Sequence, residues 1–278
     1  MPELPECETV VRSIRPHIWG CKIIRFIAAE GHELDIDGDR LQEQNIRHVG
    51  RIGKYIIFKL DDGYLVSHLR MTGQWRFVNK KYPAPTADKH FRWAFTIRGH
   101  DGNFVGHLWF KDVRKFGTMV WVDSLAEFEP FSRLGVDGLE LDDPKEVFKI
   151  CQVAKKTRRP VKNFLLDQAV IAGCGNIYAS EALFKSKINP KVSTRDLESD
   201  VITTLCSNLH EIFQKSVDLG GSSVSDYTGG QYQDVLQVYG RKKEPCFECS
   251  TPIEKITQAG RSTFFCPTCQ GEEENELF

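Results

Sequence analysis

Four cysteines near the end of the chain constrain its fold more than any other feature of the sequence. Cys246, Cys249, Cys266 and Cys269 form the pattern C-x2-C-x16-C-x2-C, a spacing typical of zinc ribbons. Because four thiolates complete the tetrahedral coordination of Zn2+ and leave no position for substrate, we expect one structural zinc ion. It would hold together two hairpins that are too small to bury a core of their own. We expect no organic cofactor.

The length and the charge set broader limits. A chain of 278 residues suits two domains of ordinary size rather than one. We find no segment of membrane-spanning length and no signal peptide, so the expected location is the cytoplasm. The net charge of -1 neither favours a general nucleic-acid coat protein nor argues strongly against an enzyme that acts on nucleic acid. The dispersed cysteines are interpreted as reduced thiols, namely Cys7, Cys21, Cys151, Cys174 and Cys206.

The hydrophobic period changes along the chain. Helical spacing of apolar residues first predicts a helix from Pro5 to about Trp19, which Pro16 should kink or shorten. Short apolar alternations follow, with Asp62-Gly63 and Asp101-Gly102 as hairpin turns. They predict a first domain that is mostly β, with two packed sheet layers. The predicted strands are Ile23 to Ala28, Tyr55 to Leu60, Tyr64 to Leu69, Phe91 to Ile97, Phe104 to Phe110 and Thr118 to Val122.

Helical periodicity returns in the second half of the chain, beyond a boundary expected near Ser124 to Asp137. A polar loop bracketed by glycines, Gly221 to Gln231, follows these helices and is of the kind that often carries binding specificity. The predicted helices are Pro144 to Gln152, Val161 to Gln168, Ile177 to Phe184 and Val201 to Leu219.

The amino terminus could carry unusual chemistry. Removal of Met1 would leave Pro2 with a free secondary amine, about a tenth of it unprotonated at neutral pH if its pKa is near that of an ordinary α-amino group. Glu3 and Glu6 lie within one turn of this amine. The same stretch would also serve as an ordinary helix start, with Pro5 in the first turn and acidic side chains at the positive end of the helix. The hexapeptide alone favours this ordinary reading.

Two further segments suggest contacts with nucleic acid. Gly173-Cys174-Gly175-Asn176 precedes a helix that Asn176 is suited to cap, and its glycines would let the backbone approach a phosphate. A basic run from Lys155 to Lys162 lies just upstream, which favours a grip on backbone phosphate over a plain turn between helices. Elsewhere, Met71, Arg114 and Phe116 stand at loop positions, where they could fill a vacated base stack and contact the unpaired base. His68 is interpreted as a structural histidine.

Taken together, these motifs resemble the formamidopyrimidine-DNA glycosylase family over nearly the whole chain. The resemblance rests on Pro2-Glu3-Leu4-Pro5-Glu6, Gly53-Lys54-Tyr55, the Met71 segment, Arg114 to Gly117, Gly175-Asn176-Ile177-Tyr178-Ala179-Ser180-Glu181, and the four-cysteine ribbon with Arg261. It implies an α+β protein of two domains, with an N-terminal helix and β-sandwich and a C-terminal helix-two-turn-helix domain with a zinc finger. The boundaries it implies are 1–130, 131–240, 241–271 for the zinc finger and 272–278 for an acidic tail.

The resemblance also implies an activity and a set of functional residues. It implies a bifunctional DNA glycosylase and abasic-site lyase of base excision repair. Such an enzyme would remove 8-oxoguanine and formamidopyrimidines through a Schiff base on Pro2, then cut the strand by β- and δ-elimination. The implied partner is double-stranded DNA with oxidised bases or abasic sites, bound by a monomer. The implied catalytic residues are Pro2, Glu3, Lys54 and Arg261, and the implied lesion and DNA contacts are Glu6, Met71, His90, Arg114, Phe116, Asn176, Tyr239 and Lys155.

Departures from the family pattern leave alternatives open. Val113 and Lys115 stand where proline and arginine are common, and Cys7 stands where valine is common. The Gly221 to Gln231 loop looks short beside the loop that covers the extruded purine in many relatives. One alternative is an oxidised-pyrimidine glycosylase of the endonuclease VIII type, although Leu4 favours the purine-directed side. The other is a non-catalytic binder of damaged DNA, which would have no use for a free proline amine.

Overall fold

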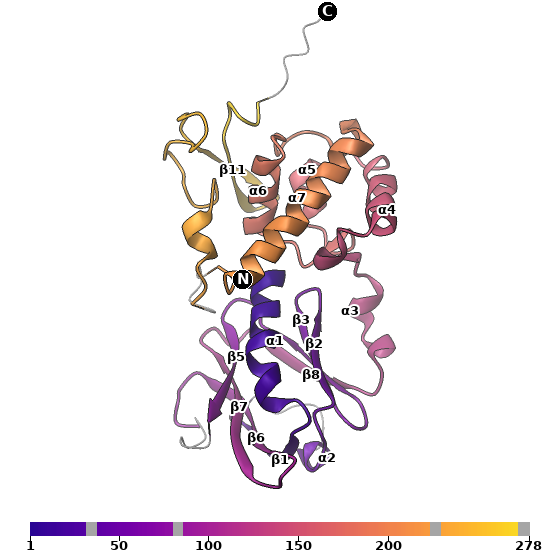
Figure 1. The fold of residues 1–278 in the computed structure, drawn as a ribbon, viewed down its shortest axis with the longest axis vertical. Helices are drawn as coiled ribbons and strands as arrows, with labels where there is room; N and C mark the ends of the chain where they lie inside the picture. Colours follow the sequence, from indigo (N-terminus) through magenta and orange to yellow (C-terminus); the bar gives the residue numbers. More distant parts are fainter. Residues whose placement is uncertain (32–37, 80–85, 223–228, 272–278) are drawn as a thin grey trace, which may run out of the picture. The chain divides into compact units, whose positions relative to one another are not determined.

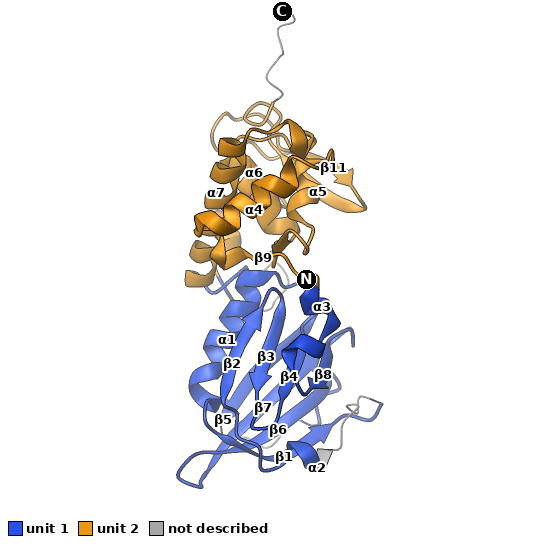
Figure 2. Ribbon diagram, turned by 90° about the vertical axis from the view of Figure 1, so that its right-hand side faces the viewer, with its two compact units in different colours: residues 1–132, 220–230 blue, residues 133–219, 231–278 orange. Residues whose placement is uncertain are grey.

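The computed structural model describes residues 1–31, 38–79, 86–222 and 229–271. The chain divides into two compact units, coloured separately in Figure 2. Unit 1 comprises residues 1–132 and 220–230, and unit 2 comprises residues 133–219 and 231–278. A short segment from late in the sequence therefore belongs to the amino-terminal unit.

Unit 1 begins with helix α1 (Leu4–Ile18), which lies along the strands in Figure 1. Pro5 occupies the second helical position, where a missing N–H costs no intrahelical bond. The helix continues through Pro16 to Ile18, so Pro16 does not shorten it; the predicted kink stays a prediction. The apolar face of α1 is buried in the core of unit 1, which holds the amino end of the chain in a fixed place.

The rest of unit 1 is built on two antiparallel four-stranded sheets, ordered β1-β6-β7-β5 and β2-β3-β4-β8. Their apolar side chains share one core with α1, as in a β-sandwich. The strands are β1 (Lys22–Ala28), β2 (His48–Ile52), β3 (Tyr55–Lys59), β4 (Tyr64–His68), β5 (Gly73–Asn79), β6 (Phe91–Arg98), β7 (Phe104–Asp112) and β8 (Thr118–Val122). Short helices α2 (Gly38–Leu41), η1 (Leu125–Glu127) and α3 (Glu129–Ser132) complete the unit.

Trp75 on β5 lies at the centre of this core. Its ring contacts Phe58, Phe95 and Phe110, with ring centroids 5.2, 5.8 and 5.0 Å away. Its indole N–H is satisfied by the Ser67 hydroxyl at 3.0 Å. Burial of each such large side chain contributes roughly 1.5 to 3 kcal/mol. The core therefore gives a rigid base to the β4–β5 and β7–β8 loops.

The six predicted strands and both predicted hairpins of unit 1 are confirmed, since β3 pairs with β4 and β6 with β7. The sequence analysis missed β2 and β5. The five residues of β2 include Gly50 and a pair of basic side chains, which obscure the alternation. β5 follows directly on a segment that was interpreted only for its loop residues, although Trp75 and Phe77 alternate with polar side chains.

Unit 2 is mainly helical. Its central helix α6 (Asn176–Lys185) is buried from Ile177 to Phe184, because α5, α7 and β12 pack around it. The predicted helix from Val161 to Gln168 is shorter than expected and ends at Leu165, where Asp167 turns the chain by accepting N–H bonds from Ala169 and Val170. The other elements are β9 (Val136–Asp137), η2 (Gly138–Glu140), α4 (Pro144–Ala154), α5 (Val161–Leu165), β10 (Ile171–Ala172), η3 (Thr194–Asp196), α7 (Ser199–Asp218), η4 (Tyr232–Val235), β11 (Glu254–Gln258) and β12 (Arg261–Phe265).

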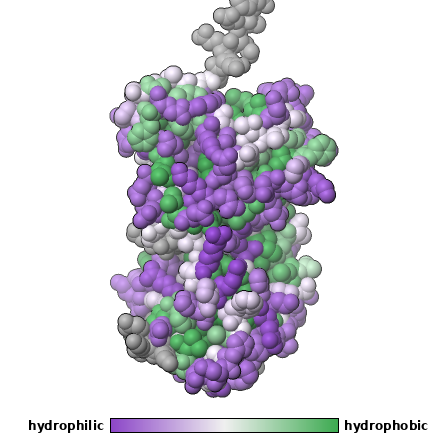
Figure 3. Space-filling view, viewed as in Figure 1, coloured by the Kyte–Doolittle hydropathy of each residue, from purple (hydrophilic) through white to green (hydrophobic). Residues whose placement is uncertain are grey.

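The surface in Figure 3 is largely hydrophilic, with separate hydrophobic patches. Among the described helices, none is both long enough and apolar enough to cross a lipid bilayer. The strands β11 and β12 form the hairpin of the four-cysteine ribbon, and Phe264 and Ile253 of this region pack in one cluster with Phe184 of α6. The ribbon is thus tied to the central helix of unit 2.

Candidate functional site

The amino end of α1 gathers two buried carboxylates. Pro2 is buried, and Glu3 and Glu6 are only 3% and 2% exposed. One carboxylate oxygen of Glu6 accepts the backbone N–H of Glu3 at 2.8 Å, and the other accepts the backbone N–H of Ser222 at 2.8 Å. Glu6 therefore holds the first residues of the chain and the returning segment of unit 1 in one place.

Charged groups from three places in the sequence surround the amine of the chain. This amine belongs to Met1 in the full chain, and burial lowers its pKa. Glu3 and Glu6 oppose that shift, while Lys54 and Arg114 add to it. Lys54 itself is 6% exposed. The structure thus brings together residues predicted separately from the amino terminus, the β2–β3 turn and the β7–β8 loop.

Cys7 lies beside this group but has no role as a nucleophile. Its Sγ donates to the carbonyl oxygen of Lys54 at 3.4 Å. Burial raises the pKa of the Cys7 thiol to about 12, and the nearby Glu6 carboxylate adds to the shift. The thiolate needed for nucleophilic attack is therefore scarce at neutral pH.

Asp112, at the end of β7, organises the loop that carries Arg114 and Phe116. Its buried carboxylate accepts the backbone N–H of Gly117 at 2.6 Å and that of Arg114 at 3.1 Å. The Thr72 hydroxyl bonds to the same carboxylate and also accepts the N–H of Arg114 at 2.9 Å. The loops that contain Met71 and Arg114 are therefore fastened to each other. The sequence analysis assigned no role to Asp112 or Thr72.

The side chains predicted to enter a DNA duplex lie on these fastened loops. Phe116 is 53% exposed, and the Arg114 guanidinium lies 4.9 Å from the centre of its ring. Met71 is half-buried in the β4–β5 loop. An exposed aromatic ring is costly to hold in water, and a cation above its face suits a surface that stacks on bases.

His68 behaves as the structural histidine that the sequence suggested. It is buried at the end of β4, and its Nδ1 accepts the backbone N–H of Arg70 at 2.9 Å. Burial lowers its pKa to about 3, and the cations of Arg70 and Lys54 act in the same direction. The ring is therefore neutral at physiological pH.

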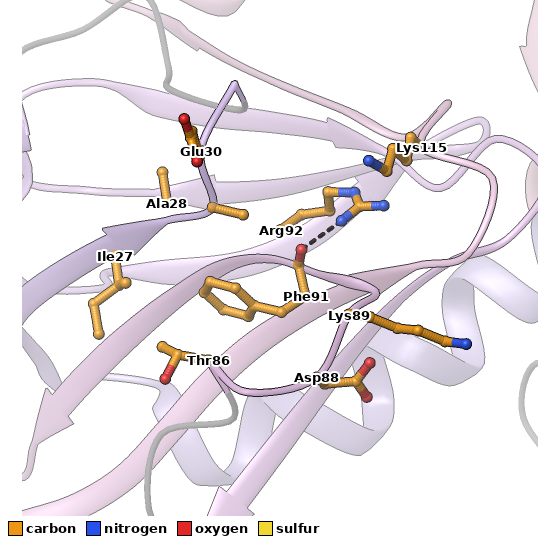
Figure 4. Close-up of a pocket in the computed structure, with 10 residues that line it drawn as sticks. Ile27, Ala28, Glu30, Thr86, Asp88, Lys89, Phe91, Arg92 and Lys115 are labelled. Carbon is orange, nitrogen blue, oxygen red and sulfur yellow. Dashed lines mark hydrogen bonds between the residues drawn. The ribbon is translucent and has the colours of Figure 1, made fainter.

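A pocket of about 370 Å³ lies next to the Arg114 loop, and its charged lining residues are Lys89, Arg92 and Lys115 together with Glu30 and Asp88 (Figure 4). Arg92 is buried and donates to the carbonyl oxygens of Phe91 at 2.6 Å and Asp112 at 2.8 Å. Burial lowers the pKa of Arg92, although Asp112 opposes the shift. The half-buried His90 adjoins this pocket in sequence, and its carbonyl oxygen accepts the N–H of Asp112.

In unit 2, Asn176 does not cap α6 as the sequence suggested. Gly175 is the N-cap, and Asn176 is the first residue of the helix. Its side chain is occupied elsewhere, because Oδ1 accepts from Lys162 Nζ at 2.6 Å and Nδ2 donates to the Ser262 carbonyl at 2.8 Å. Lys162 is fully buried, so its expected place in a basic run that binds phosphate directly was also wrong. Arg261 is exposed and directly precedes Ser262 at the start of β12.

Glu181 is a positioning residue that the sequence analysis quoted without a role. Its buried carboxylate accepts three consecutive backbone N–H groups, from Gln237 at 2.8 Å, Val238 at 3.0 Å and Tyr239 at 2.8 Å. Burial raises the pKa of Glu181, and these three bonds oppose the rise. Tyr239 is thereby fixed to α6, and its ring contacts Phe264 of β12.

Lys155 and the Gly221 to Gln231 loop are the remaining predicted features of the site. Lys155 lies at the end of α4, where its ammonium bonds to the Leu197 carbonyl at 3.0 Å and to Glu198 at 3.4 Å. In the described part of the chain it is not bonded to the group around Asn176. Of the Gly221 to Gln231 loop, residues 223–228 lie outside the described residues.

The four cysteines of the ribbon fit a tetrahedral zinc ion. Their sulfur atoms all lie within 4.8 Å of one another, and zinc–sulfur bonds of about 2.3 Å would place tetrahedral sulfurs about 3.8 Å apart. The Cys246–Cys269 and Cys249–Cys266 sulfur distances are 3.9 and 3.4 Å. The other five cysteines are free thiols. The ribbon therefore holds a structural zinc, as the cysteine spacing predicted.

Family models match most of the chain. The formamidopyrimidine-DNA glycosylase N-terminal domain matches residues 1–119, the H2TH domain of the same enzymes matches residues 134–228, and the zinc finger found in FPG and IleRS matches residues 243–271. The chain belongs to the formamidopyrimidine-DNA glycosylase family. Its α+β fold, with a β-sandwich, a helix-two-turn-helix domain and a zinc finger, is the one expected from the sequence.

Relatives in this family are similar over nearly their full length. Formamidopyrimidine-DNA glycosylase of Cytobacillus firmus is 37% identical and that of Halalkalibacterium halodurans is 38% identical, each over 97% of this chain and all of the relative. Among solved structures, complexes of the Lactococcus lactis enzyme with Fapy-dG DNA and with abasic-site DNA both give a TM-score of 0.85 at 35% identity. Each covers 97% of this chain and all of the matched chain.

Proposed function

We propose that this protein is a DNA glycosylase of base excision repair that removes oxidised purines and cuts the strand at the resulting abasic site. The observation that carries the proposal is the buried amino end of α1, where Pro2 lies beside the buried carboxylates of Glu3 and Glu6, and where burial and the Lys54 cation lower the pKa of the neighbouring Met1 amine. The names of the family members and the complexes with Fapy-dG and abasic DNA support the same activity.

The chemistry begins with removal of Met1, which makes the Pro2 nitrogen a secondary amine. Its lone pair forms a bond to C1′ of the damaged nucleotide, while the bond from C1′ to the base breaks and the base leaves with a proton. Ring opening of the sugar gives an iminium ion, whose nitrogen carries no hydrogen to lose. Loss of a C2′ proton then expels the 3′ phosphate, and a second elimination expels the 5′ phosphate. A pKa lowered by burial would increase the fraction of free amine.

The neighbouring charges have separate tasks in this scheme. Glu3 transfers a proton at the sugar. Glu6 has both carboxylate oxygens bonded to backbone N–H groups, so its task is to hold the amine segment in place. Lys54 binds the phosphate beside the lesion as a point charge.

The DNA duplex is gripped by residues of both units. Exposed Phe116 wedges the stack, Met71 fills the gap left by the extruded nucleotide, and Arg114 bonds to the unpaired base. His90, Asn176, Tyr239, Lys155 and Arg261 contact backbone phosphate. Such contacts position the duplex without reading its sequence.

Other features of the proposal concern the whole protein. Oxidised purines such as 8-oxoguanine and formamidopyrimidines are the proposed lesions, and the protein is proposed to act as a monomer in the cytoplasm, where it reaches the chromosome. The domain boundaries 1–130, 131–240, 241–271 and 272–278 remain predictions.

Trapping of the iminium ion tests the proposal. Borohydride added to the protein and damaged duplex should yield a covalent protein–DNA adduct. Pro2→Gly, or a tag left on the amino terminus, should abolish or severely reduce the adduct, while Pro16→Ala serves as a proline control away from the amine. Mass spectrometry of the purified chain must first verify that Pro2 is the terminal residue.

The choice of duplex separates the competing functions. Adducts formed fastest with 8-oxoguanine or formamidopyrimidine support the purine-directed enzyme, whereas a preference for oxidised pyrimidines supports the endonuclease VIII type. Tight binding without any adduct on these lesions or on abasic DNA would mean a non-catalytic binder of damaged DNA and would overturn the enzymatic proposal.

A further inference from the structure

Lys162 is a cation buried where no phosphate can touch it. It is 0% exposed on α5. Its ammonium donates to Asn176 Oδ1 at 2.6 Å, to the Thr263 hydroxyl at 2.8 Å and to the Ser262 carbonyl at 3.1 Å. These bonds engage all three donors of the ammonium group. Lys162 thus joins α5, the first residue of α6 and the start of β12.

This arrangement fixes the orientation of the Asn176 amide. An ammonium group has no acceptor, so only the oxygen end of the amide can face it. The nitrogen end then lies against the Ser262 carbonyl, to which it donates at 2.8 Å. Without the cation, the preference for this one orientation of the Asn176 amide would be much weaker.

Burial of Lys162 is difficult to explain by stability alone. Removal of an ammonium from water is expensive, and a well-packed apolar side chain of similar volume often stabilises a core at least as well. The positive end of the α6 dipole lies at Asn176, which makes the position still less favourable for a cation.

We propose that Lys162 is a positioning residue for phosphate binding. It locks the Asn176 amide in one orientation, with the nitrogen end of the amide against the Ser262 carbonyl. The inference rests on the proposed DNA binding by Asn176 and Arg261, and assigns to Lys162 an action through Asn176 rather than a phosphate contact of its own.

A double-mutant cycle tests this action. Duplex with a tetrahydrofuran abasic analogue, which cannot be cleaved by base release, is titrated with wild type, Lys162→Met, Asn176→Ala and the double variant by fluorescence anisotropy. Lys162→Met should raise Kd by about tenfold in the wild-type background but by less than about twofold when Asn176 is already alanine. Lys185→Met, which removes an exposed cation from the other end of α6, is the matched control and should change Kd by less than about twofold.

Two further measurements separate positioning from other roles. Lys162→Met should leave the slope of log K against log salt unchanged. Arg261→Gln should reduce the magnitude of this slope by about the amount expected for the loss of one phosphate contact. At saturating enzyme, the single-turnover cleavage rate of Lys162→Met on an abasic duplex should match that of wild type. Lys162→Gln, which keeps an N–H donor without the charge, should recover part of the lost affinity and replaces Lys162→Met in the cycle if that variant does not fold.

The outcomes are distinct. Equal penalties from Lys162→Met in both backgrounds, an unchanged Kd in a folded variant, or a changed salt slope would overturn the positioning role. Failure of the wild-type protein itself to bind the duplex would instead overturn the proposed function.

Discussion

The carboxylate of Glu6 accepts the backbone N–H of Ser222, 216 residues further along the chain, at 2.8 Å. The same carboxylate accepts the N–H of Glu3 through its other oxygen. One buried side chain therefore ties the amino-terminal end of the protein to the segment that enters the Gly221 to Gln231 loop. Glu6 thus links the position of the amine to the position of that segment.

Substitution of Glu6 by glutamine should weaken both connections. The amide has one acceptor instead of two, so its NH2 group would face one of the two N–H donors. We expect a loss of about 1 to 3 kcal/mol in the free energy of unfolding, because a buried donor is left unsatisfied. Urea denaturation measures the loss, and slower borohydride trapping should accompany it. Glu43→Gln, in an exposed pair with Lys22, is the control, and an equal effect there would show that Glu6 has no special role.

Asp112→Asn should loosen the loop that carries Arg114 and Phe116. Asparagine cannot accept the N–H groups of both Gly117 and Arg114 while also bonding the Thr72 hydroxyl. We expect about 1 to 3 kcal/mol of destabilisation and a smaller preference for the base opposite the lesion. Excision rates opposite each of the four bases measure the second effect. Val113→Ala in the same exposed loop should cost less than about 0.5 kcal/mol; a preference unchanged in Asp112→Asn would contradict the organising role.

Acid should destabilise unit 1 through His68. The pKa of His68 is about 3 in the folded chain against an ordinary value of 6.5, so the unfolded state binds more protons between these values. The stability contributed by neutral His68 is therefore complete above pH 6.5 and is lost as the pH falls, by up to about 1.4 kcal/mol per pH unit. His68→Asn, whose oxygen can replace Nδ1 as acceptor for Arg70, should flatten the plot of unfolding free energy against pH. An equal flattening by His48→Asn, at an exposed position, would rule out burial as the cause.

Removal of zinc should weaken DNA binding and leave unit 1 largely folded. The β11–β12 hairpin carries Arg261 and Ser262, and small ribbons of this kind fold only around their metal. Cys249→Ser should reduce bound zinc below one ion per chain by atomic absorption and raise Kd for abasic-analogue DNA by at least about tenfold. Near-ultraviolet circular dichroism of the Trp75 core should persist. Undiminished DNA binding by zinc-free protein would contradict the role of the ribbon.

The sequence predicted most of the regular structure because hydrophobic period is a local property. The apolar residues alternate with others in strands such as Phe91–Arg98 and recur at helical spacing in helix Ser199–Asp218, so both elements are predictable from the sequence. Two strands of unit 1, β2 and β5, were missed. Gly50 and two basic side chains obscure the alternation in β2, and β5 follows a segment that was interpreted only for its loop residues. The length of α5 was overestimated because Asp167 ends the helix through bonds that no periodicity reveals.

The residues of the candidate site also differ in how far the sequence could predict their roles. The four cysteines were found from the sequence, because a metal-ligand spacing carries its chemistry in the residues themselves. The roles of Pro2 and Glu3 rest on the family resemblance and remain predictions. Lys162 was assigned to an exposed basic run, and Asn176 to a helix cap. Each depends on partners far away in the chain, so neither role could be read from neighbours alone.

The sequence by itself determined the family and the ribbon, and it supplied the candidates for the reacting residues. Only the tertiary structure decided which side chains hold them: Glu6 through Ser222, Asp112 through Thr72, and Lys162 through Asn176. The physical reason is that reactivity and metal binding belong to individual side chains, whereas buried hydrogen bonds exist only once folding brings donor and acceptor together and excludes water.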